Sequence, residues 1–140
     1  MTKEELKQLF KQKIIPHQRT PYHYQRIEAP QYEVSAYNPF CGDKYCIQIS
    51  KDHQGYFQGI GCAISQASTS ILLQRIEGMS GNEIVEYCQQ FLQALAQDAP
   101  VPDEELTVLA ALKHFDGRMD CITLPWKALE DYFRELAANE

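Results

Sequence analysis

The sequence predicts an α+β fold in which a three-stranded antiparallel meander packs against about four to five helices. Apolar and polar residues alternate in three short segments between residues 31 and 60, as expected for strands that bury one face. Turn-forming residues separate these segments, so consecutive strands can pair with each other. After Cys62, apolar residues recur every three or four positions, which is the period of amphipathic helices.

The N-terminal residues predict a short helix followed by an irregular segment. Thr2–Glu5 has the spacing of a capping box, and apolar residues follow it at helical spacing. We expect this helix to run to about Lys13 and to end before Pro16, because proline disrupts a helix interior. Residues 15–31 hold three prolines among polar and aromatic residues, so we expect an irregular segment that wraps over the domain.

Three strands are predicted at residues 31–37, 44–51 and 56–60, with turns at 38–43 and 52–55. Because the side chains of a strand alternate between its two faces, each strand should bury every second residue. The expected inward-facing residues are Tyr32, Val34 and Ala36 in the first strand, and Tyr45, Ile47 and Ile49 in the second.

Four helices are predicted in the remainder of the chain. The first covers residues 63–77, and the second begins after a capping box at Ser80–Glu83. A short helix is expected at 103–112, and a last helix at about 121–137. Pro125 is compatible with that last helix only in its first turn. The apolar stripe of the second helix contains Ile84, Val85, Cys88, Phe91, Leu92 and Leu95.

The composition is that of an ordinary globular protein, and it narrows the classes of partner. Apolar residues make up 44% of the chain and charged residues 23%, and the net charge is -6. An acidic chain argues against nucleic acid as the main partner, since phosphate binding requires a basic surface. No apolar run is long enough to span a membrane, and the N-terminal residues lack the apolar region of a signal peptide. We therefore expect a cytoplasmic protein with no membrane partner.

The basic residues of the N-terminal third are interpreted as a solvated face, with a protein-docking patch as the alternative. The four histidines have no candidate metal ligand beside them in the sequence, so solvated or capping roles are expected for them. The basic cluster consists of Lys11, Lys13, His17 and Arg19.

Three of the five cysteines occupy positions where the backbone leaves room for a metal or a substrate. Cys41 lies in the predicted turn between the first two strands, and Cys62 and Cys121 lie at predicted helix N-termini. A helix N-terminus favours thiolate, because the helix dipole and unpaired N–H groups stabilise negative charge. Asp43 adds a carboxylate two residues after Cys41. Three thiolates and one carboxylate suit tetrahedral zinc, and the same thiolates suit an iron–sulfur cluster.

The spacing leaves a second interpretation open, in which the cysteines are small buried residues. No Cys-x-x-Cys pair is present, and the spacings are not those of zinc fingers. Burial is the preferred interpretation for Cys88, which lies on a helical apolar stripe. Cys46 lies on the strand face opposite Tyr45, where either burial or a surface thiol is consistent with the pattern.

Three stretches of the chain resemble known cysteine motifs. Residues 38–43 (Asn-Pro-Phe-Cys-Gly-Asp), 59–70 (Gly-Ile-Gly-Cys-Ala-Ile-Ser-Gln-Ala-Ser-Thr-Ser) and 118–126 (Arg-Met-Asp-Cys-Ile-Thr-Leu-Pro-Trp) resemble those of the U-type iron–sulfur cluster assembly proteins. This family includes the NifU N-terminal domain, IscU and SufU. The resemblance extends over about residues 32–130 in the same order. It implies a single U-type domain over residues 1–140, with the α+β fold of that family.

Within this family the chain looks closest to the SufU type. Asp120 occupies the position at which IscU-type proteins have a histidine, and the paired prolines of their chaperone-recognition motif are absent. Residues of about 99–117 resemble the insertion that marks SufU, and a turn is expected within it at 116–117. Arg118 and the run at 123–130 (Thr-Leu-Pro-Trp-Lys-Ala-Leu-Glu) also resemble SufU.

The resemblance implies a zinc-dependent sulfur-transfer protein. SufU-type proteins accept persulfide sulfur from a cysteine desulfurase of the SUF system and pass it to downstream iron–sulfur assembly proteins. The acceptor corresponds to Cys41. Two alternatives remain open: a scaffold that assembles a [2Fe–2S] cluster on the same cysteines, and a domain whose zinc is purely structural. The zinc ligands of SufU-type proteins correspond to Cys41, Asp43, Cys62 and Cys121.

Three further expectations concern this site. Arg118 is a candidate to neutralise the negative charge of the thiolates, or else a surface residue. Asp120 should raise the pKa of the thiol beside it in the absence of metal, or should itself be the fourth ligand in place of Asp43. Cys62, between a strand and a helix, should be held most rigidly. We therefore expect it to anchor the metal while Cys41 moves on its turn.

Overall fold

The computed structural model describes residues 2–114 and 118–139, and it confirms the α+β fold. Val34 is opposite Ile47, which is opposite Phe57 on the third strand. All three are buried, so a row of apolar side chains crosses the inner face of the sheet, as the alternation predicted. The sheet is antiparallel with the order β1 (Tyr32–Asn38), β2 (Asp43–Ile49) and β3 (Gly55–Ile60).

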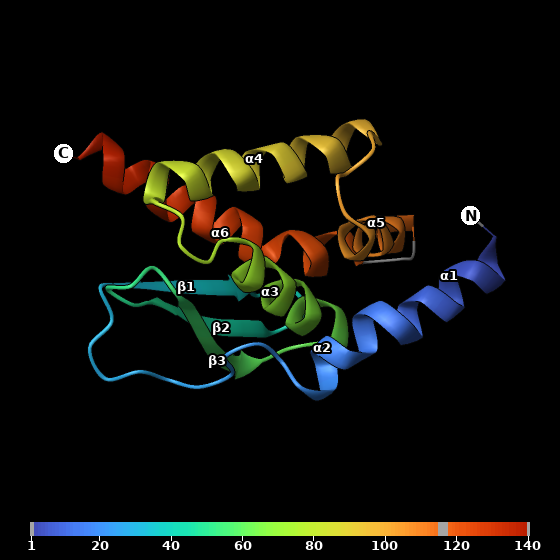
Figure 1. The fold of residues 1–140 in the computed structure, drawn as a ribbon, viewed down its shortest axis with the longest axis horizontal. Coiled ribbons are helices and arrows are strands. Elements are labelled where there is room, and N and C mark those ends of the chain that lie inside the picture. Colours follow the sequence, from blue (N-terminus) through green and yellow to red (C-terminus); the bar gives the residue numbers. More distant parts are fainter. Residues whose placement is uncertain (1, 115–117, 140) are drawn as a thin grey trace.

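Helices cover this sheet in layers (Figure 1). The N-terminal helices α1 (Lys3–Leu9) and α2 (Ile15–Arg19) flank a π-helical turn, η1 (Phe10–Ile14). The later elements are α3 (Ala63–Arg75), α4 (Gly81–Gln97), α5 (Glu104–Ala111), the 3₁₀ turn η2 (Leu112–His114) and α6 (Arg118–Ala138). α6 packs on β1 and α3 packs on β3, while α4 covers α6 on the side away from the sheet (Figure 1).

Trp126 of α6 joins three helices in the core. Its side chain is fully buried and stacks on Phe91 of α4, with ring centroids 4.0 Å apart. Its indole Nε1 donates a hydrogen bond to Ser68 Oγ of α3 (2.9 Å), and this hydroxyl donates to the carbonyl of Ile122 (2.6 Å). The buried polar groups are therefore satisfied, and α3, α4 and α6 are held in one arrangement.

α4 begins and packs as its sequence predicts. Ser80 Oγ accepts the N–H of Glu83 (3.3 Å), and the Glu83 carboxylate accepts the N–H of Ser80 (3.1 Å), which completes the capping box. The predicted stripe faces the core, although Val85 and Leu92 are only half-buried. Its fully buried members are Ile84, Cys88, Phe91 and Leu95.

The prediction that the first helix ends before Pro16 is wrong, because the chain stays helical to Arg19. Pro16 lies at the second position of α2, where a helix has no acceptor for the missing N–H. The π-helical turn precedes it, with the N–H of Ile15 bonded to the carbonyl of Phe10. Only residues 20–31 form the predicted irregular segment.

The last helix also begins earlier than predicted. α6 starts at Arg118, so Pro125 lies in its interior and not in its first turn. Pro125 has no N–H to donate within the helix, but its side chain is buried. The core residues Ile122 and Trp126 flank it along α6. The packing of this face therefore outweighs the local preference against proline. The turn predicted at 116–117 lies outside the described residues.

His17 is buried, whereas the sequence predicted a solvated side chain. Its Nδ1 lies 2.7 Å from Ser70 Oγ in α3, and its Nε2 lies 2.7 Å from the carboxylate of Glu105 in α5. Ser70 Oγ also accepts the N–H of Tyr22 (2.8 Å). His17 therefore links the N-terminal segment to α3 and α5, through residues too far apart in sequence for a local pattern to indicate.

Arg75 of α3 extends this network to the start of α5. Its guanidinium donates to Asp103 Oδ2 (2.8 Å) and to the carboxylate of Glu105. Burial opposes the ionisation of both carboxyl groups, but their hydrogen bonds, first among them those from Arg75, outweigh it, so the pKa of each is lowered. Asp103 also caps α5 by accepting the N–H of Leu106 (2.8 Å), so the ion pairs hold the N-terminus of α5 against α3.

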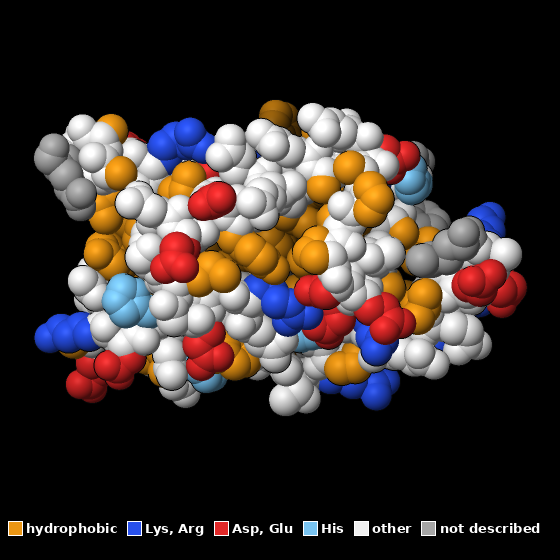
Figure 2. Space-filling view, turned by 45° about the horizontal axis from the view of Figure 1, so that its top comes forward, with side chains coloured by type: hydrophobic (Ala, Val, Ile, Leu, Met, Phe, Trp, Pro, Cys, Tyr) orange, Lys and Arg blue, Asp and Glu red, His pale blue; other side chains and the backbone are white. Residues whose placement is uncertain are grey.

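The surface is mixed in character. On the face shown in Figure 2, acidic and basic side chains are interspersed, with hydrophobic side chains exposed between them. Within residues 2–114 and 118–139, no helix is both long and apolar enough to cross a membrane.

We expect Arg75→Met to lower the free energy of unfolding by about 2 kcal/mol at neutral pH, because two partly buried carboxylates lose their cation. The pKa values of Asp103 and Glu105 are lowered in the folded protein. Their stabilisation is therefore present above the unfolded values of about 4 and is lost as the pH falls through the folded values. Urea unfolding at about pH 7 and about pH 3 measures this effect. The free energies of unfolding of the wild type and the Arg75→Met variant should differ more at pH 7.

The matched control is Arg134→Met, which removes an i,i+4 pair between the exposed Arg134 and the partly buried Glu130 on α6. It should change the free energy of unfolding by less than about 0.5 kcal/mol. Equal effects of the Arg75 variant at both pH values would contradict the assignment of the network.

Candidate metal centre

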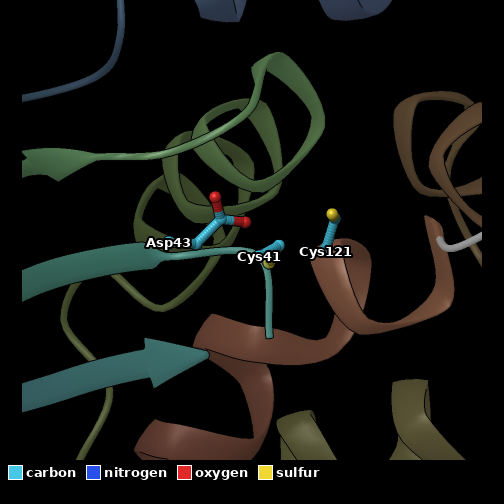
Figure 3. A group of neighbouring side chains, drawn as sticks. All are labelled: Cys41, Asp43 and Cys121. Atoms are coloured by element: carbon cyan, nitrogen blue, oxygen red, sulfur yellow. The ribbon is translucent and has the colours of Figure 1, made fainter. Parts of the chain in front are cut away.

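Three side chains with metal-ligating atoms meet where β2 begins beside α6. Cys41 comes from the turn before β2, Asp43 from the first position of β2, and Cys121 from the first turn of α6. Their ligand atoms all lie within 4.8 Å of one another (Figure 3). The fold thus brings together three of the four residues of the expected ligand set, from two distant parts of the chain.

The β1–β2 turn makes Cys41 accessible. Asn38 Oδ1 accepts the N–H of Phe40 (3.0 Å), and the Asn38 carbonyl accepts the N–H of Gly42 (2.8 Å). Gly42 has a φ of 78°, a conformation that residues with a side chain rarely adopt. The turn leaves the Cys41 thiol exposed next to Phe40.

Asp43 has a buried carboxylate, with only 3% of the residue exposed. Its Oδ1 accepts the backbone N–H of Cys62 (3.0 Å), which fixes the start of α3 against β2. Its Oδ2 is buried and has no hydrogen-bond partner within the part of the chain that is described. Such an atom is costly to bury alone. The thiols of Cys41 and Cys121 beside the carboxylate complete a sulfur and oxygen donor set that fits zinc.

Cys62 lies at the site, but its sulfur is outside the tight group of ligand atoms. It is the N-cap of α3, as the sequence predicted, and its Sγ accepts the N–H of Ser65 (3.3 Å). The junction is narrow: a Cβ on Gly61 would lie 2.2 Å from the hydroxyl oxygen of Tyr45, so only glycine fits. The Tyr45 hydroxyl also shares a hydrogen bond with Ser65 Oγ (2.8 Å), which fixes the first turn of α3 to β2.

Cys121 is buried, and burial is the largest cause that raises its pKa, to about 12. A hydrogen bond with Cys62 and the negative charges of Cys62, Asp43 and Cys41 raise it further. Asp120, whose charge was expected to act on this thiol, is exposed to solvent. A cation bound beside Cys121 would offset these negative charges.

The other two cysteines lie outside this group, and none of the five, all of which are described, forms a disulfide. Cys88 is fully buried in α4, as predicted, and burial raises its pKa. Cys46 is partly buried on β2, and its S–H donates to Glu33 Oε1 (3.0 Å). Burial and this hydrogen bond raise the pKa of Cys46. Both thiols are therefore poor nucleophiles at neutral pH.

Arg118 is exposed at the first position of α6, one turn before Cys121. It forms no ion pair with any other residue that the structure describes. The expectation that it neutralises the thiolates therefore stays a prediction.

The sequence interpretation missed a group of exposed apolar side chains around the thiols. Phe40 is 95% exposed and Ile60 is 79% exposed. Each member of the group lies within four residues of a cysteine of the site, which was the only signal in the sequence. We call this group the apolar rim; it consists of Tyr37, Phe40, Ile60 and Met119.

Comparison with known proteins agrees with this arrangement. Residues 9–131 match the family described as NifU-like N terminal domain. The chain belongs to this family. The matched segment contains the β1–β2 turn, the start of α3 and the first turns of α6, so every element of the site lies within the NifU-like region.

Relatives of this NifU-like chain include a sulfurtransferase and iron–sulfur cluster assembly scaffold proteins. The chain is 30% identical over 129 residues to the zinc-dependent sulfurtransferase SufU of Bacillus subtilis (strain 168), with 87% of each protein covered. It is 28% identical over 144 aligned residues to the iron–sulfur cluster assembly scaffold protein IscU of Streptococcus pyogenes serotype M1, covering 98% of this chain and 90% of the relative. The chain thus belongs to a family with iron–sulfur cluster assembly members of both IscU and SufU type.

Solved structures share its fold. The N-terminal part of a NifU-like protein from Brucella abortus has a TM-score of 0.77 at 14% identity. The alignment covers 94% of this chain and 96% of that one. A protein described as an iron–sulfur cluster assembly scaffold for the SUF system, from Fervidobacterium islandicum AW-1, has a TM-score of 0.74 at 24% identity. The alignment covers 89% of this chain and 96% of that one. At these identities the likeness shows the fold alone.

We expect iodoacetamide to modify the metal-free chain first at Cys41, because that thiol is exposed while Cys88 and Cys121 are buried with raised pKa values. Timed reaction at about pH 8, followed by peptide mass spectrometry, gives a rate for each cysteine. Cys41 should react at least about tenfold faster than Cys88, the internal reference. Equal rates for Cys41 and Cys121 would contradict the burial of Cys121.

Proposed function

We propose that this chain is a zinc-dependent sulfur-transfer protein of iron–sulfur cluster assembly, which accepts sulfur on Cys41 from a cysteine desulfurase. The observation that carries the proposal is the buried Asp43 carboxylate, which has one oxygen without a described partner and lies beside two cysteine sulfurs. The 30% identity to a zinc-dependent sulfurtransferase supports the same function.

The zinc ligands in this proposal are Cys41, Asp43, Cys62 and Cys121. The backbone N–H of Cys62 orients the Asp43 carboxylate, and the N–H of Ser65 donates a hydrogen bond to Cys62 Sγ. Bound zinc would keep the coordinated thiols deprotonated and protect them from oxidation. We assign Arg118 the role of offsetting the negative charge of this thiolate-rich site.

Cys41 is proposed as the sulfur acceptor because it is the exposed thiol of the site and is held on a turn. Cys62 is fixed at the start of α3 and Cys121 is buried in α6, so both are suited to anchoring the metal. In the transfer, the Cys41 thiolate attacks the terminal sulfur of the desulfurase persulfide. The sulfur–sulfur bond breaks, the desulfurase cysteine leaves as a thiolate, and Cys41 carries the persulfide without any added oxidant or reductant.

The apolar rim supports a protein partner at this site, since each of its exposed apolar side chains lies within four residues of a cysteine of the site, and exposed apolar surface marks interaction sites. We propose that the partner is the cysteine desulfurase of the SUF system, and that downstream iron–sulfur assembly proteins receive the sulfur. Five cysteines without a disulfide fit a reducing compartment, so the proposed location is the cytoplasm.

We further propose that residues 1–140 act as one domain, with residues of about 99–117 as a SufU-like insertion. α5 lies within that stretch, and Arg75 and His17 fasten its N-terminus to α3 and α2. These contacts support the described part of this stretch, residues 99–114, as a packed part of the domain.

The alternative function is a scaffold that assembles a [2Fe–2S] cluster on the same residues. Two relatives named as IscU scaffolds, at 28% and 27% identity, favour it. Metal analysis of anaerobically purified protein, combined with a desulfurase assay, separates the candidates. One tightly bound zinc with stimulated turnover supports sulfur transfer, and coloured, iron-containing protein supports the scaffold. Zinc without any effect on a desulfurase indicates a structural site.

We expect Cys41→Ser to abolish stimulation of the desulfurase, because a hydroxyl cannot carry persulfide sulfur. Turnover is measured as sulfide released from cysteine in the presence of a thiol reductant. Cys46→Ser, on the neighbouring strand and outside the ligand group, is the matched control and should stimulate as the wild type does. Full stimulation by the Cys41 variant would remove Cys41 as the acceptor.

We expect Asp43→Asn to weaken zinc binding by at least about tenfold while the chain stays folded. The amide oxygen can still accept the N–H of Cys62, but the ligand charge is lost. Competition with a chromophoric chelator measures the affinity. Asp120→Asn removes the same charge from the exposed neighbour of Cys121 and should leave the affinity unchanged. The opposite pattern would make Asp120 the ligand.

A further inference from the structure

A groove of about 380 Å³ lies between β1 and α6, and its lining includes Phe40 and Asp120, the sequence neighbours of Cys41 and Cys121. One wall is formed by residues 35–40, which are the end of β1 and the turn before Cys41. This volume is within the range of about 300–1,000 Å³ that is typical of ligand sites. The other wall is one stripe of α6, namely Asp120, Thr123, Leu124, Lys127, Ala128 and Asp131.

The α6 wall sets the length of the groove. From Asp120 to Asp131, α6 rises about 17 Å at 1.5 Å per residue. The opposite wall is extended only to Asn38, where β1 ends, and Pro39 and Phe40 lie in the turn. The α6 wall is as long as about five residues of an extended peptide.

β1 is an edge strand whose outer side is uncovered. The sheet order places β1 and β3 at the edges, but β3 is covered by the segment that contains Tyr24. There, the N–H of Phe57 bonds to the carbonyl of His23 (3.1 Å), and the Tyr24 hydroxyl bonds to the carbonyl of Gly59 (2.7 Å).

No comparable segment covers β1. Within residues 2–114 and 118–139, β1 forms ladder pairs with β2 alone. β1 contains neither lysine nor proline; its one charged residue, Glu33, lies outside the groove lining, and Pro39 follows the end of the strand. An edge of this kind offers unpaired backbone donors and acceptors to an added strand.

Charge and position indicate what the groove would bind. Asp120 and Asp131 are exposed at the two ends of the α6 wall, with Lys127 between them. The groove therefore has a negative charge at each end. At one end, Phe40 and Asp120 are the direct neighbours of Cys41 and Cys121. A chain segment in the groove would therefore point toward the thiols, and basic residues near its ends would complement the aspartates.

We propose that this groove binds an extended, basic segment of a protein partner, which adds a strand to β1 and directs that partner to the thiol site. The backbone of β1 would provide main-chain hydrogen bonds, and the small side chain of Ala128 would leave room for alternate side chains of the segment. The proposal concerns recognition and goes beyond the proposed sulfur transfer.

The test uses a phage-displayed library of random, cysteine-free octapeptides, selected on the purified full chain. Enriched peptides should carry Lys or Arg near both ends. Hydrogen–deuterium exchange with the best peptide should slow at residues 35–38 of β1 and not at β3. Asp131→Lys should weaken the peptide about tenfold, because an attractive charge becomes repulsive. Ala128→Arg, which fills the groove, should abolish binding.

The matched control is Glu135→Lys, which makes the same charge change one turn further along α6 and outside the groove. It should leave the affinity within about twofold of the wild type. Failure to enrich any peptide, equal weakening by the Asp131 and Glu135 variants, or unprotected β1 amides would each overturn the proposal. The assay contains no desulfurase, so its result is separate from that of the proposed function.

Discussion

The hydrogen bond between the Asp43 carboxylate and the backbone N–H of Cys62 is the contact on which the site depends. It joins the first residue of β2 to the N-cap of α3, and so fixes two of the sequence motifs relative to each other. Because it uses only one carboxylate oxygen, the other is buried with an unmet requirement for a partner. The same contact that builds the fold therefore leaves a buried carboxylate oxygen free for the proposed metal.

The remainder of the core holds the third motif against this pair. α6 carries Cys121 in its first turn, and Trp126 fastens α6 to α3 and α4 from within the core. The position of Cys121 is thus set by packing one to two turns further along the same helix. Rigid placement of Cys62 and Cys121, with Cys41 on an exposed turn, suits a site in which one ligand leaves to react while the others remain.

Functional features are concentrated at one end of the sheet. The turn that exposes Cys41 also exposes Phe40 and closes one end of the groove along β1. The opposite edge of the sheet is covered by residues of the N-terminal segment, which His17 anchors to α3 and α5. One edge is therefore used for stability, and the other stays accessible to partners.

The sequence by itself determined the strands, most of the helices and the three cysteine motifs, because alternation, helical periodicity and capping residues act over a few neighbouring positions. It also placed Cys62 at a helix N-terminus and Cys88 in the core. Only the tertiary structure decided that His17 is buried, that α6 continues through Pro125, and that Asp43 has a buried oxygen without a described partner. Each of these depends on contacts between residues distant in the chain, which outweigh local preferences and leave no local pattern.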